Sequence, residues 1–173
     1  MEVAYYVAAS LDGYIATRDG GIGWLKPYES AHEDYGYAAF YASVDVVLMG
    51  GRTFEQCLRF DHWPYADKPC WVFSHEHYDK VPPGVTITAE PPAQLLAALQ
   101  SQWLKRAWLV GGGKLAASFM AQALISEYIV SIIPVLLGAG IPLLDGTTLQ
   151  EELNLVDAKR YASGVMQLRY APS

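Results

Sequence analysis

The chain has 173 residues, of which 52% are apolar and 17% are charged, which excludes a disordered protein and predicts a single domain over residues 1–173. Twelve basic and eighteen acidic residues give a formal net charge of −6, which argues against nucleic acid and anionic membranes as partners. Glu2 does not suit a secretory peptide, Cys57 and Cys70 form no Cys-x-x-Cys pair, and the longest uncharged run, 128–144, contains two prolines and two glycines. We therefore expect a cytoplasmic protein without a membrane-spanning helix.

The first forty residues combine one strand signal with a loop signal and a helix signal. The apolar run over 3–9 predicts a buried strand that ends at an Asp-Gly turn. The glycine-rich residues 17–27 predict a loop. Ser30 and Glu33 form a capping box, in which each side chain accepts a hydrogen bond from a backbone N–H near the other, so a helix is expected over 31–42.

The middle of the chain repeats the order strand, turn and helix. The β-branched run over 44–49 predicts a strand that ends in two glycines, and a short helix is expected to begin at Arg52. Two further strands are expected over 70–73 and 85–88, separated by a Pro-Pro-Gly turn. A second Pro-Pro pair then opens an Ala/Leu/Gln-rich helix over 92–103.

The last third of the chain begins with the same order and ends in strands. The apolar run over 107–110 predicts a buried strand, three glycines follow it, and 115–124 form an Ala-rich helix with an apolar stripe. Three strand-like runs close the chain, over residues 127–134, 153–161 and 165–170. Strands that alternate with helices predict an α/β fold with helices on both faces of the sheet, and the closing strand pair is expected to be antiparallel.

The triple glycine at 111–113 is the sharpest local signal, because it lies between a buried strand and a helix. Glycines there let the backbone approach a ligand closely, and the free N–H groups and dipole at the start of a helix favour a phosphate. A tight turn that needs positive φ at one position is the alternative. A P-loop is excluded, because its outer glycine and its Ser or Thr are missing. The fingerprint Gly111-x-Gly113-x-x-Ala116 lacks the acid that follows about 20 residues later in dinucleotide-binding folds.

Two other turns at strand ends carry polar residues. Gly51, Arg52 and Thr53 lie where open α/β sheets bind ligands, and an arginine there can hold a phosphate through two N–H groups. A solvated arginine at the start of a helix is the alternative. Ser74 and His75 follow the third expected strand and offer a hydroxyl and an imidazole to a phosphate or a ribose, unless they are ordinary surface residues.

Metal and nucleophile chemistry find less support in the sequence. His75 and His77 alternate as they would on one strand face, but no third ligand has a suitable spacing. No Gly-x-Ser-x-Gly nucleophile elbow is present. We therefore expect no bound metal.

The order of several short motifs along the chain is more specific than any one of them. These motifs are Ser10-Leu11-Asp12-Gly13-Tyr14-Ile15-Ala16, Gly23-Trp24-Leu25, residues 45–55 around Gly-Gly-Arg-Thr, Val72-Phe73-Ser74, Val110-Gly111-Gly112-Gly113, and residues 134–143 around Leu-Gly-Ala-Gly. In this order they resemble the dihydrofolate reductase-like superfamily, and more closely its branch related to the reductase domain of the bifunctional riboflavin-biosynthesis deaminase-reductase. The similarity extends from the first strand to the last.

This resemblance implies a three-layer α/β/α fold around a central mixed, mostly parallel sheet of about eight strands, with NADPH across the carboxyl ends of the strands. The residues that it assigns to the cofactor are Ala8, Ile15 and Ala16 at the nicotinamide, Gly111, Gly112 and Gly113 at the diphosphate, Arg52, Thr53, Ser74 and His75 at the adenosine end, and also Gly51, Lys114 and Leu115. Residues 20–24, with Gly23 and Trp24, are expected to form a mobile lid.

Asp34 falls at the position of the family's substrate-facing carboxylate. If Trp24 and Tyr35 screen it from water, its pKa is raised and it holds or protonates a pterin or pyrimidine ring. The alternative is an acid in the first turn of a helix, which the helix dipole favours and which has no part in catalysis.

The resemblance therefore predicts an NADPH-dependent reductase that transfers a hydride to a small heterocyclic substrate, pterin-like or pyrimidine-like, or to a carbonyl substrate. Its models are dihydrofolate reductase and the 5-amino-6-(5-phosphoribosylamino)uracil reductase of riboflavin biosynthesis, although the zinc deaminase half of the bifunctional enzyme is absent from the sequence. A nucleotide-binding protein of the same fold without turnover is the alternative. The apolar strands near the C-terminus, and the dimers common among related proteins, predict a homodimer.

Overall fold

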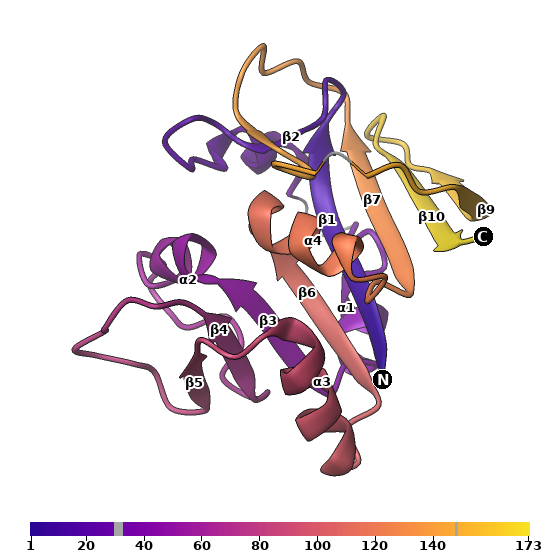
Figure 1. Cartoon of the computed structure of the whole chain (residues 1–173). Helices are drawn as coiled ribbons and strands as arrows, with labels where there is room; N and C mark the ends of the chain where they lie inside the picture. Colours follow the sequence, from indigo (N-terminus) through magenta and orange to yellow (C-terminus); the bar gives the residue numbers. More distant parts are fainter. Residues whose placement is uncertain (30–32, 148) are drawn as a thin grey trace.

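An eight-stranded sheet forms the centre of the molecule in this computed structural model, which describes residues 1–29, 33–147 and 149–173 (Figure 1). Its strands are, in chain order, β1 (Glu2–Ser10), β3 (Val46–Gly50), β4 (Cys70–Phe73), β5 (Val85–Thr88), β6 (Arg106–Gly111), β7 (Glu127–Ile133), β9 (Leu153–Arg160) and β10 (Met166–Pro172). Across the sheet they lie in the order β5-β4-β3-β6-β1-β7-β10-β9. Neighbouring strands are parallel, except that β10 runs antiparallel to β7 and to β9. The predicted mixed, mostly parallel sheet and its antiparallel closing pair are confirmed.

Helices pack on both faces of the sheet, as expected for three layers. They are η1 (Gly23–Tyr28, a 3-10 helix), α1 (Tyr37–Ala42), α2 (Gly51–Cys57), α3 (Pro92–Ser101) and α4 (Gly113–Ala121). Alternating side chains of β3 enter different cores. Leu48 belongs to the core under α3 and α4, whereas Val47 and Met49 belong to the core that contains Phe40 of α1 and Phe54 of α2. Within the described ranges, no helix has the length and apolar character needed to cross a membrane.

A second, small sheet closes one end of the molecule, and no sequence pattern predicted it. It consists of β2 (Tyr14–Ala16) and β8 (Ile141–Pro142), which run antiparallel. Gly140 makes this pairing possible, because a Cβ there would collide with the carbonyl oxygen of Ala16 and lie 3.1 Å from Cβ of Tyr14. The last glycine of the Leu-Gly-Ala-Gly motif is therefore required by close backbone packing.

The carboxylate of Asp12 joins the turn between β1 and β2 to the segment that precedes β8. Asp12 accepts hydrogen bonds from the backbone N–H groups of Gly138, at 2.7 Å, and Leu137, at 3.1 Å, and from the hydroxyl of Ser10, at 2.6 Å. These hydrogen bonds, of which the one from Ser10 has the largest effect, lower the pKa of Asp12. The turn at Asp12 and the segment around Gly138 and Gly140 thus hold β2 in place.

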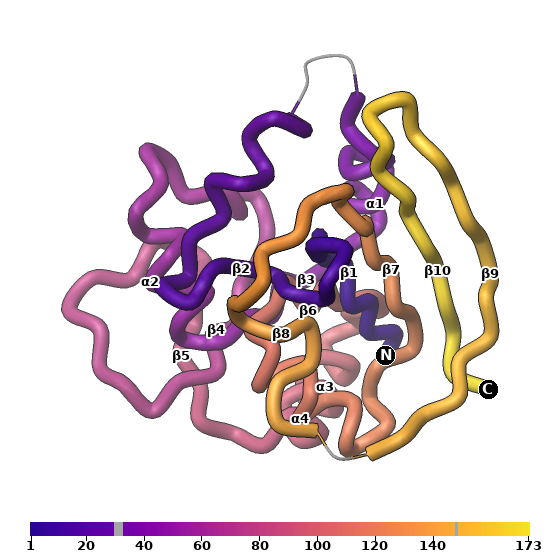
Figure 2. Tube along the Cα trace, turned by 90° about the horizontal axis from the view of Figure 1, so that it is seen from above, coloured from indigo at the N-terminus to yellow at the C-terminus, as the bar shows by residue number. Residues whose placement is uncertain are grey.

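The loop after β2 is anchored by a third apolar cluster at the β9–β10 turn. Its buried members are Ile133, Tyr161 and Val165, and the side chains packed against them include Trp24, Leu25, Tyr28 and Tyr35. Seen from above (Figure 2), β10 and β9 form the edge of the sheet that lies opposite α2. The segment expected to form a lid is therefore packed on the molecule through η1.

The helix predicted over 31–42 begins later, at Tyr37. Tyr35 has φ of 55° and Gly36 has φ of 79°, a left-handed pair that no helix can contain. The carboxylate of Asp34 accepts hydrogen bonds from the N–H groups of Gly36, at 2.9 Å, and Ala38, at 3.1 Å, so it satisfies the first turn of α1. The boundary predicted from Ser30 is therefore wrong, and Ser30 itself lies outside the described residues.

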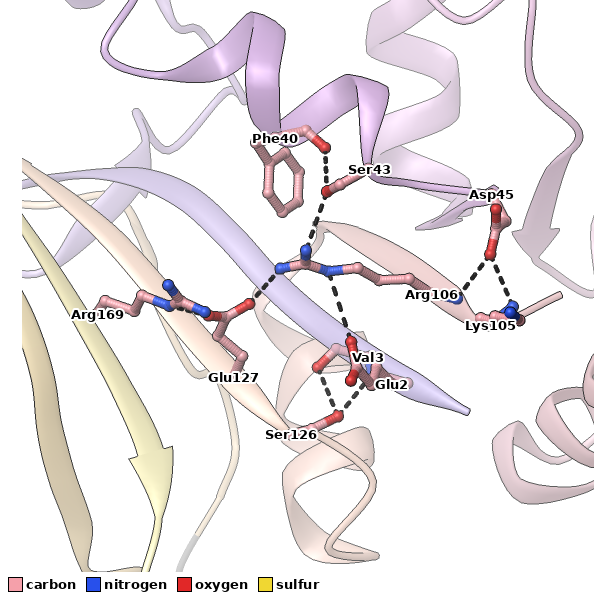
Figure 3. A network of polar contacts seen from close by, with 10 residues as sticks. All are labelled: Glu2, Val3, Phe40, Ser43, Asp45, Lys105, Arg106, Ser126, Glu127 and Arg169. Carbon is pink, nitrogen blue, oxygen red and sulfur yellow. Dashed lines mark hydrogen bonds and ion pairs between the residues drawn. The ribbon is translucent and has the colours of Figure 1, made fainter.

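At the amino ends of the parallel strands, charged side chains are paired with one another (Figure 3). Glu127 on β7 is 13% exposed and forms ion pairs with Arg106 of β6, at 2.5 Å, and with Arg169 of β10. Asp45, just before β3, accepts hydrogen bonds from the backbone N–H groups of Lys105, at 2.7 Å, and Arg106, at 2.9 Å. This edge therefore joins β3, β6, β7 and β10 through polar contacts within the chain.

Candidate functional site

A cavity of about 950 Å³ opens at the other edge of the sheet, where β1, β3 and β6 end. Ala8 of β1, Gly50 of β3 and Gly111 of β6 belong to its wall, and Ile15 and Ala16 of β2 form another part of the wall. Ligands of open α/β sheets bind at the carboxyl ends of the strands. The volume lies near the upper end of the range of about 300–1,000 Å³ typical of ligand sites.

Two glycine turns lie side by side in this wall, because β3 and β6 are neighbours in the sheet. A Cβ on Gly50 would lie 3.8 Å from Cβ of Leu115, and a Cβ on Gly112 would lie 3.6 Å from Oγ1 of Thr53. Gly112 has φ of 78°, which other residues rarely adopt. The two turns, each followed by the first turn of a helix, therefore form one continuous surface.

The third glycine of the triple fixes α4 against the small sheet. A Cβ on Gly113 would collide with the carbonyl oxygen of Pro142 and would lie 3.2 Å from Cβ of Asp145. The N–H of Asp145 donates a hydrogen bond to the carbonyl oxygen of Gly113 at 3.1 Å. Residues 111–115 all belong to the cavity wall, and the first N–H groups of a helix have no carbonyl partner within it. Each of the three glycines also has a structural reason, which is positive φ at Gly111 and Gly112 and lack of space for a side chain at Gly113.

Charged side chains are unevenly divided around the cavity. The wall contains four cationic residues and three anionic ones, namely Arg18, Arg52, Arg59 and Lys114 against Asp19, Glu55 and Asp145. The hydroxyl of Thr17 donates to the carboxylate of Asp19 and lowers its pKa, so this acid is ionised at neutral pH. The wall is thus net positive in a chain whose formal net charge is −6. This contrast favours an anionic ligand.

A neutral, largely aromatic wall faces the α1 and α2 side of the cavity. Cys57, Tyr65 and Trp108 are 5–6% exposed, and Trp108 donates its indole N–H to the carbonyl oxygen of Tyr6 at 3.0 Å. Burial raises the pKa of the Cys57 thiol to about 11 and raises the pKa of the Tyr6 hydroxyl. These groups stay uncharged at neutral pH, so this wall suits a flat, uncharged ring.

Most of the residues expected to bind the cofactor belong to this cavity wall. They are Ala8, Ile15, Ala16, Gly51, Arg52, Thr53, Gly111, Gly112, Gly113, Lys114 and Leu115. They come from β1, β2, the start of α2 and the start of α4, which are far apart in the sequence. The structure therefore brings these predicted groups together at one site.

Ser74 and His75 are not in the cavity wall. The hydroxyl of Ser74 lies 3.2 Å from that of Tyr78 and accepts a hydrogen bond from the N–H of Glu76 at 3.0 Å. A Cβ on Gly51 would lie 3.0 Å from Oγ of Ser74, so this serine packs behind the start of α2. The exposed His75 lies beyond it.

Asp34, Tyr35, Gly23 and Trp24 also lie outside the cavity wall. Asp34 is exposed, and the N–H groups of Gly36 and Ala38 lower its pKa instead of raising it, contrary to the expectation for a screened acid. Tyr35 donates its hydroxyl hydrogen to the carbonyl oxygen of Tyr28 at 2.8 Å. Of the expected lid, Gly20 and Ile22 do reach the wall, and Leu25 follows them.

Sequence reasoning missed several polar residues of the wall. Arg18 and Asp19 lie in the loop after β2, Gln56 lies in the last turn of α2, Arg59 lies just after that helix, and Asp145 follows β8. Arg18 and Asp19 directly precede residues 20–24, the expected lid, and this position could have indicated them. Nothing local marks Gln56, Arg59 or Asp145, because their position depends on how distant segments pack. Among the described residues, no three His, Cys, Asp or Glu side chains lie close enough to hold a metal ion.

Comparison with known sequences assigns almost the whole chain to one family. The family described as the RibD C-terminal domain matches residues 2–167. Two proteins of Bacillus subtilis (strain 168), the uncharacterized proteins YwjB and YyaP, are 38% and 27% identical over 166 and 177 residues. Each alignment covers 95% of this chain, and they cover 94% of YwjB and 91% of YyaP.

Solved structures agree with this assignment. A protein of Shewanella sp. PV-4 provisionally assigned to riboflavin biosynthesis superposes with a TM-score of 0.90 at 29% identity, over 100% of this chain and 99% of that one. RibD of Acinetobacter baumannii has the same fold, with a TM-score of 0.75 at 19% identity, over 99% of this chain and 58% of RibD. A pyrimidine reductase-like protein of Corynebacterium diphtheriae has a TM-score of 0.71 at 14% identity, over 99% of this chain and 92% of that one. The chain belongs to the RibD C-terminal domain family, the reductase-domain branch of the dihydrofolate reductase-like superfamily.

Proposed function

We propose that the protein is an NADPH-dependent reductase that transfers a hydride to a small planar heterocycle, pterin-like or pyrimidine-like. The observation that carries this proposal is the pair of contacting glycine turns in the wall of the cavity, with Arg52 and Lys114 beside them. Glycine backbones, free helix N–H groups and cationic side chains are what a bridging diphosphate requires. Membership of the RibD C-terminal domain family supports a reductase.

The residues of the two glycine turns would accommodate a dinucleotide because the backbone there lies open to the cavity. Gly111 and Gly112 carry no side chain that would fill the wall, and Gly113 has no room for one. The amides that begin α4 and the ammonium of Lys114 would hold the diphosphate, and Arg52 would hold the phosphate at the adenosine end. The small side chains of Ala8 and Ala16 leave space for a nicotinamide ring.

When bound, a reduced nicotinamide supplies a hydride to an electrophilic carbon, and the protein supplies position and surroundings. Tyr6 and Trp108 would orient a flat ring against the neutral wall. Burial raises the pKa values of Cys57 and Tyr6, so both side chains stay protonated and uncharged at neutral pH. The reduced substrate must also take up one proton, and solvent could supply it, because the cavity wall is exposed at Arg59 and Phe60.

The first test is ligand binding to the purified protein. A carrier at 100 times its dissociation constant adds about 2.7 kcal/mol of stability, which raises the melting temperature of a domain of this size by about 5–10 °C. We expect this rise with NADPH and a smaller one with NADH at the same concentration. No rise with either carrier contradicts the proposal.

The second test asks whether the side chain of Arg52 distinguishes NADPH from NADH. Replacing Arg52→Ala removes a charge-assisted contact, and we expect about tenfold weaker binding of NADPH, about 1.4 kcal/mol, with little change for NADH. Lys80→Ala is the matched control, because Lys80 is exposed and does not belong to the cavity wall. Equal loss with both carriers would place Arg52 away from the adenosine phosphate.

The third test is turnover, measured as the loss of reduced-nicotinamide absorbance with a panel of substrates. The panel begins with 5-amino-6-(5-phosphoribosylamino)uracil, because a Thermotoga maritima protein of the same fold is described as a reductase of this compound. Dihydropterins complete the panel. Binding of NADPH without oxidation by any member of the panel favours the alternative, a nucleotide-binding protein without turnover.

A further inference from the structure

Tyr6 brings a phenol side chain to the cavity close to the expected position of the nicotinamide. It belongs to the cavity wall, and so does Ala8, two residues later on β1. Residues two apart on a strand point to the same face of the sheet and lie about 6–7 Å apart along it. A ring held next to a nicotinamide at Ala8 would therefore lie close to the Tyr6 side chain.

The hydrogen of the Tyr6 hydroxyl is held only weakly by the protein. Among the described residues, the acceptor within hydrogen-bonding distance is the carbonyl oxygen of Tyr35, and the two oxygen atoms are 3.2 Å apart. This separation exceeds the range of about 2.5–3.0 Å for such hydrogen bonds. The same carbonyl oxygen accepts a hydrogen bond from Nε2 of Gln167 at 3.0 Å, so it does not depend on Tyr6. The hydrogen of Tyr6 is therefore available to a ligand.

The oxygen of the same hydroxyl, in contrast, is supported by donors. Gln167 of β10 places Nε2 3.2 Å from the Tyr6 hydroxyl oxygen and 3.0 Å from Oγ of Ser131 on β7. Tyr161 donates its hydroxyl hydrogen to Oε1 of Gln167 at 3.4 Å, which favours the amide orientation with its N–H groups toward Tyr6. Burial raises the pKa of Tyr6, and Gln167 and Ser131 oppose this rise because they stabilise the oxygen when its proton leaves.

The other candidate proton donors on this side of the cavity are less suited to a ligand. The indole N–H of Trp108 already donates to the carbonyl oxygen of Tyr6 at 3.0 Å. Burial raises the pKa of the Tyr65 hydroxyl, and the neighbouring Cys57 raises it further. Asp34, the acid expected from the sequence, is exposed and does not belong to the cavity wall. Tyr6 combines a position in the wall, an available hydrogen and donors at its oxygen.

We infer, on the basis of the proposed reductase function, that the Tyr6 hydroxyl is the catalytic acid of this site and that Gln167 is its positioning residue. The electrophilic carbon of a C=N or C=O bond in the substrate takes up a hydride from the reduced nicotinamide. The π electron pair of that bond moves to the nitrogen or oxygen, and this atom takes the proton of Tyr6. Two electrons thus pass from the nicotinamide, which is oxidised, to the substrate, which is reduced. Gln167 and Ser131 stabilise the phenolate left on Tyr6 until solvent returns a proton to it.

Ligand binding tests the hydrogen bond from Tyr6 without turnover. The probes are 5-amino-6-(5-phosphoribosylamino)uracil and a dihydropterin, each titrated by calorimetry into the protein saturated with NADP⁺. We expect Tyr6→Phe to weaken probe binding about three- to tenfold, because one neutral hydrogen bond is lost, and to leave the affinity for NADPH within about twofold. Tyr170→Phe is the matched control, since Tyr170 lies on β10 and does not belong to the cavity wall.

Turnover separates the roles of Tyr6 and Gln167. With a panel member that the wild type reduces, Tyr6→Phe should lower kcat about 100-fold. Gln167→Met keeps the length of the side chain but removes its N–H groups, so it should lower kcat about tenfold and leave the KM of both substrates within about twofold. In the Tyr6→Phe background, Gln167→Met should have no further effect on kcat, because no phenolate remains to be stabilised. An equal loss of kcat in both backgrounds overturns the role of Gln167.

Two results overturn the role of Tyr6 and leave the reductase proposal standing. One is binding and oxidation of NADPH in which Tyr6→Phe keeps the wild-type kcat. The other is a wild type that binds NADPH but binds neither probe at up to about 1 mM, the upper end of usual KM values. Tyr6→Phe removes a single oxygen atom, so this arm of the test stands even if circular dichroism shows that Gln167→Met does not fold. A wild type that does not bind NADPH overturns the reductase proposal itself, so the two failures are distinct.

Discussion

The amino ends and the carboxyl ends of the parallel strands differ in whether their charged side chains are paired within the chain. At the amino ends, Glu127 is paired with two arginines and Asp45 accepts two backbone hydrogen bonds (Figure 3). At the carboxyl ends, Arg52 and Lys114 line an open cavity beside glycine turns. The contrast teaches that charge alone does not mark a site: charges satisfied within the chain stabilise the fold, and charges around a cavity remain available to a ligand.

The largest expected effect is at the amino end, on stability. Glu127→Ala leaves Arg106 and Arg169 facing each other without their shared carboxylate. Removing one partner of a buried pair costs about 3–5 kcal/mol, so for these partly buried pairs we expect at most about 3 kcal/mol. We expect a melting temperature lower by at most about 6–12 °C, read by calorimetry, with unchanged nucleotide affinity in the folded protein. Glu90→Ala, at an exposed position, is the control. A large loss of nucleotide affinity would show that the two ends are not independent.

The next effect is at the carboxyl end, on binding. Lys114→Ala should weaken NADPH and NADH alike by about tenfold, because both carriers share the diphosphate, and should leave the melting temperature of the free protein within about 1–2 °C. Titration calorimetry measures the affinities. A variant that melts much earlier without ligand would mean that Lys114 is structural, like Glu127.

At the amino end, acid should act through Asp45. The N–H groups of Arg106 and Lys105 lower the pKa of Asp45, so its contribution is present above its ordinary value of about 3.9 and is lost as the pH falls through the lowered value. We expect Asp45→Asn to melt earlier than the wild type at pH 7 by about 1–3 °C, and the gap to narrow at about pH 3. A gap that widens on acidification would contradict this assignment.

The smallest effect is expected at Asp34. Its carboxylate is exposed and bonded to Gly36 and Ala38, so Asp34→Asn should leave the affinity for NADPH and the turnover of any identified substrate unchanged. Only a slight decrease in melting temperature is expected, because the amide oxygen still accepts a hydrogen bond at the start of α1. Loss of turnover at constant NADPH affinity would return Asp34 to a catalytic role.

Several parts of the fold follow from patterns confined to short stretches of sequence. Buried runs such as 44–49 and 107–110 predict β3 and β6, because a central parallel strand is apolar on both faces. The glycines after them mark the cavity, because strand-to-helix turns at this edge meet in space whatever the order of the strands. Ser74 and His75 share that position in the sequence, but in the structure Phe73, the last residue of β4, belongs to the cavity wall, whereas Ser74 packs behind the start of α2 and His75 is exposed. No local pattern reports which side chains of this turn face the cavity.

Other parts depend on contacts that the sequence does not display. β2 and β8 have three residues and two residues, too few for periodicity to appear. The start of α1 was misplaced because a capping box describes one turn, whereas the left-handed backbone at Tyr35 and Gly36 follows from packing of Tyr35 against the β9–β10 turn. Arg59 and Asp145 enter the cavity wall through tertiary structure alone.

Gly140 has a consequence that reaches beyond its own turn. Any side chain at this position would push against the carbonyl oxygen of Ala16, and Ala16 forms part of the opposite wall of the cavity. The width of the cavity is therefore set partly from outside its wall, by a residue that does not belong to the lining. Substituting Gly140 would therefore be a way to change the width of the cavity by protein engineering. Such a substitution changes none of the residues proposed to contact a ligand.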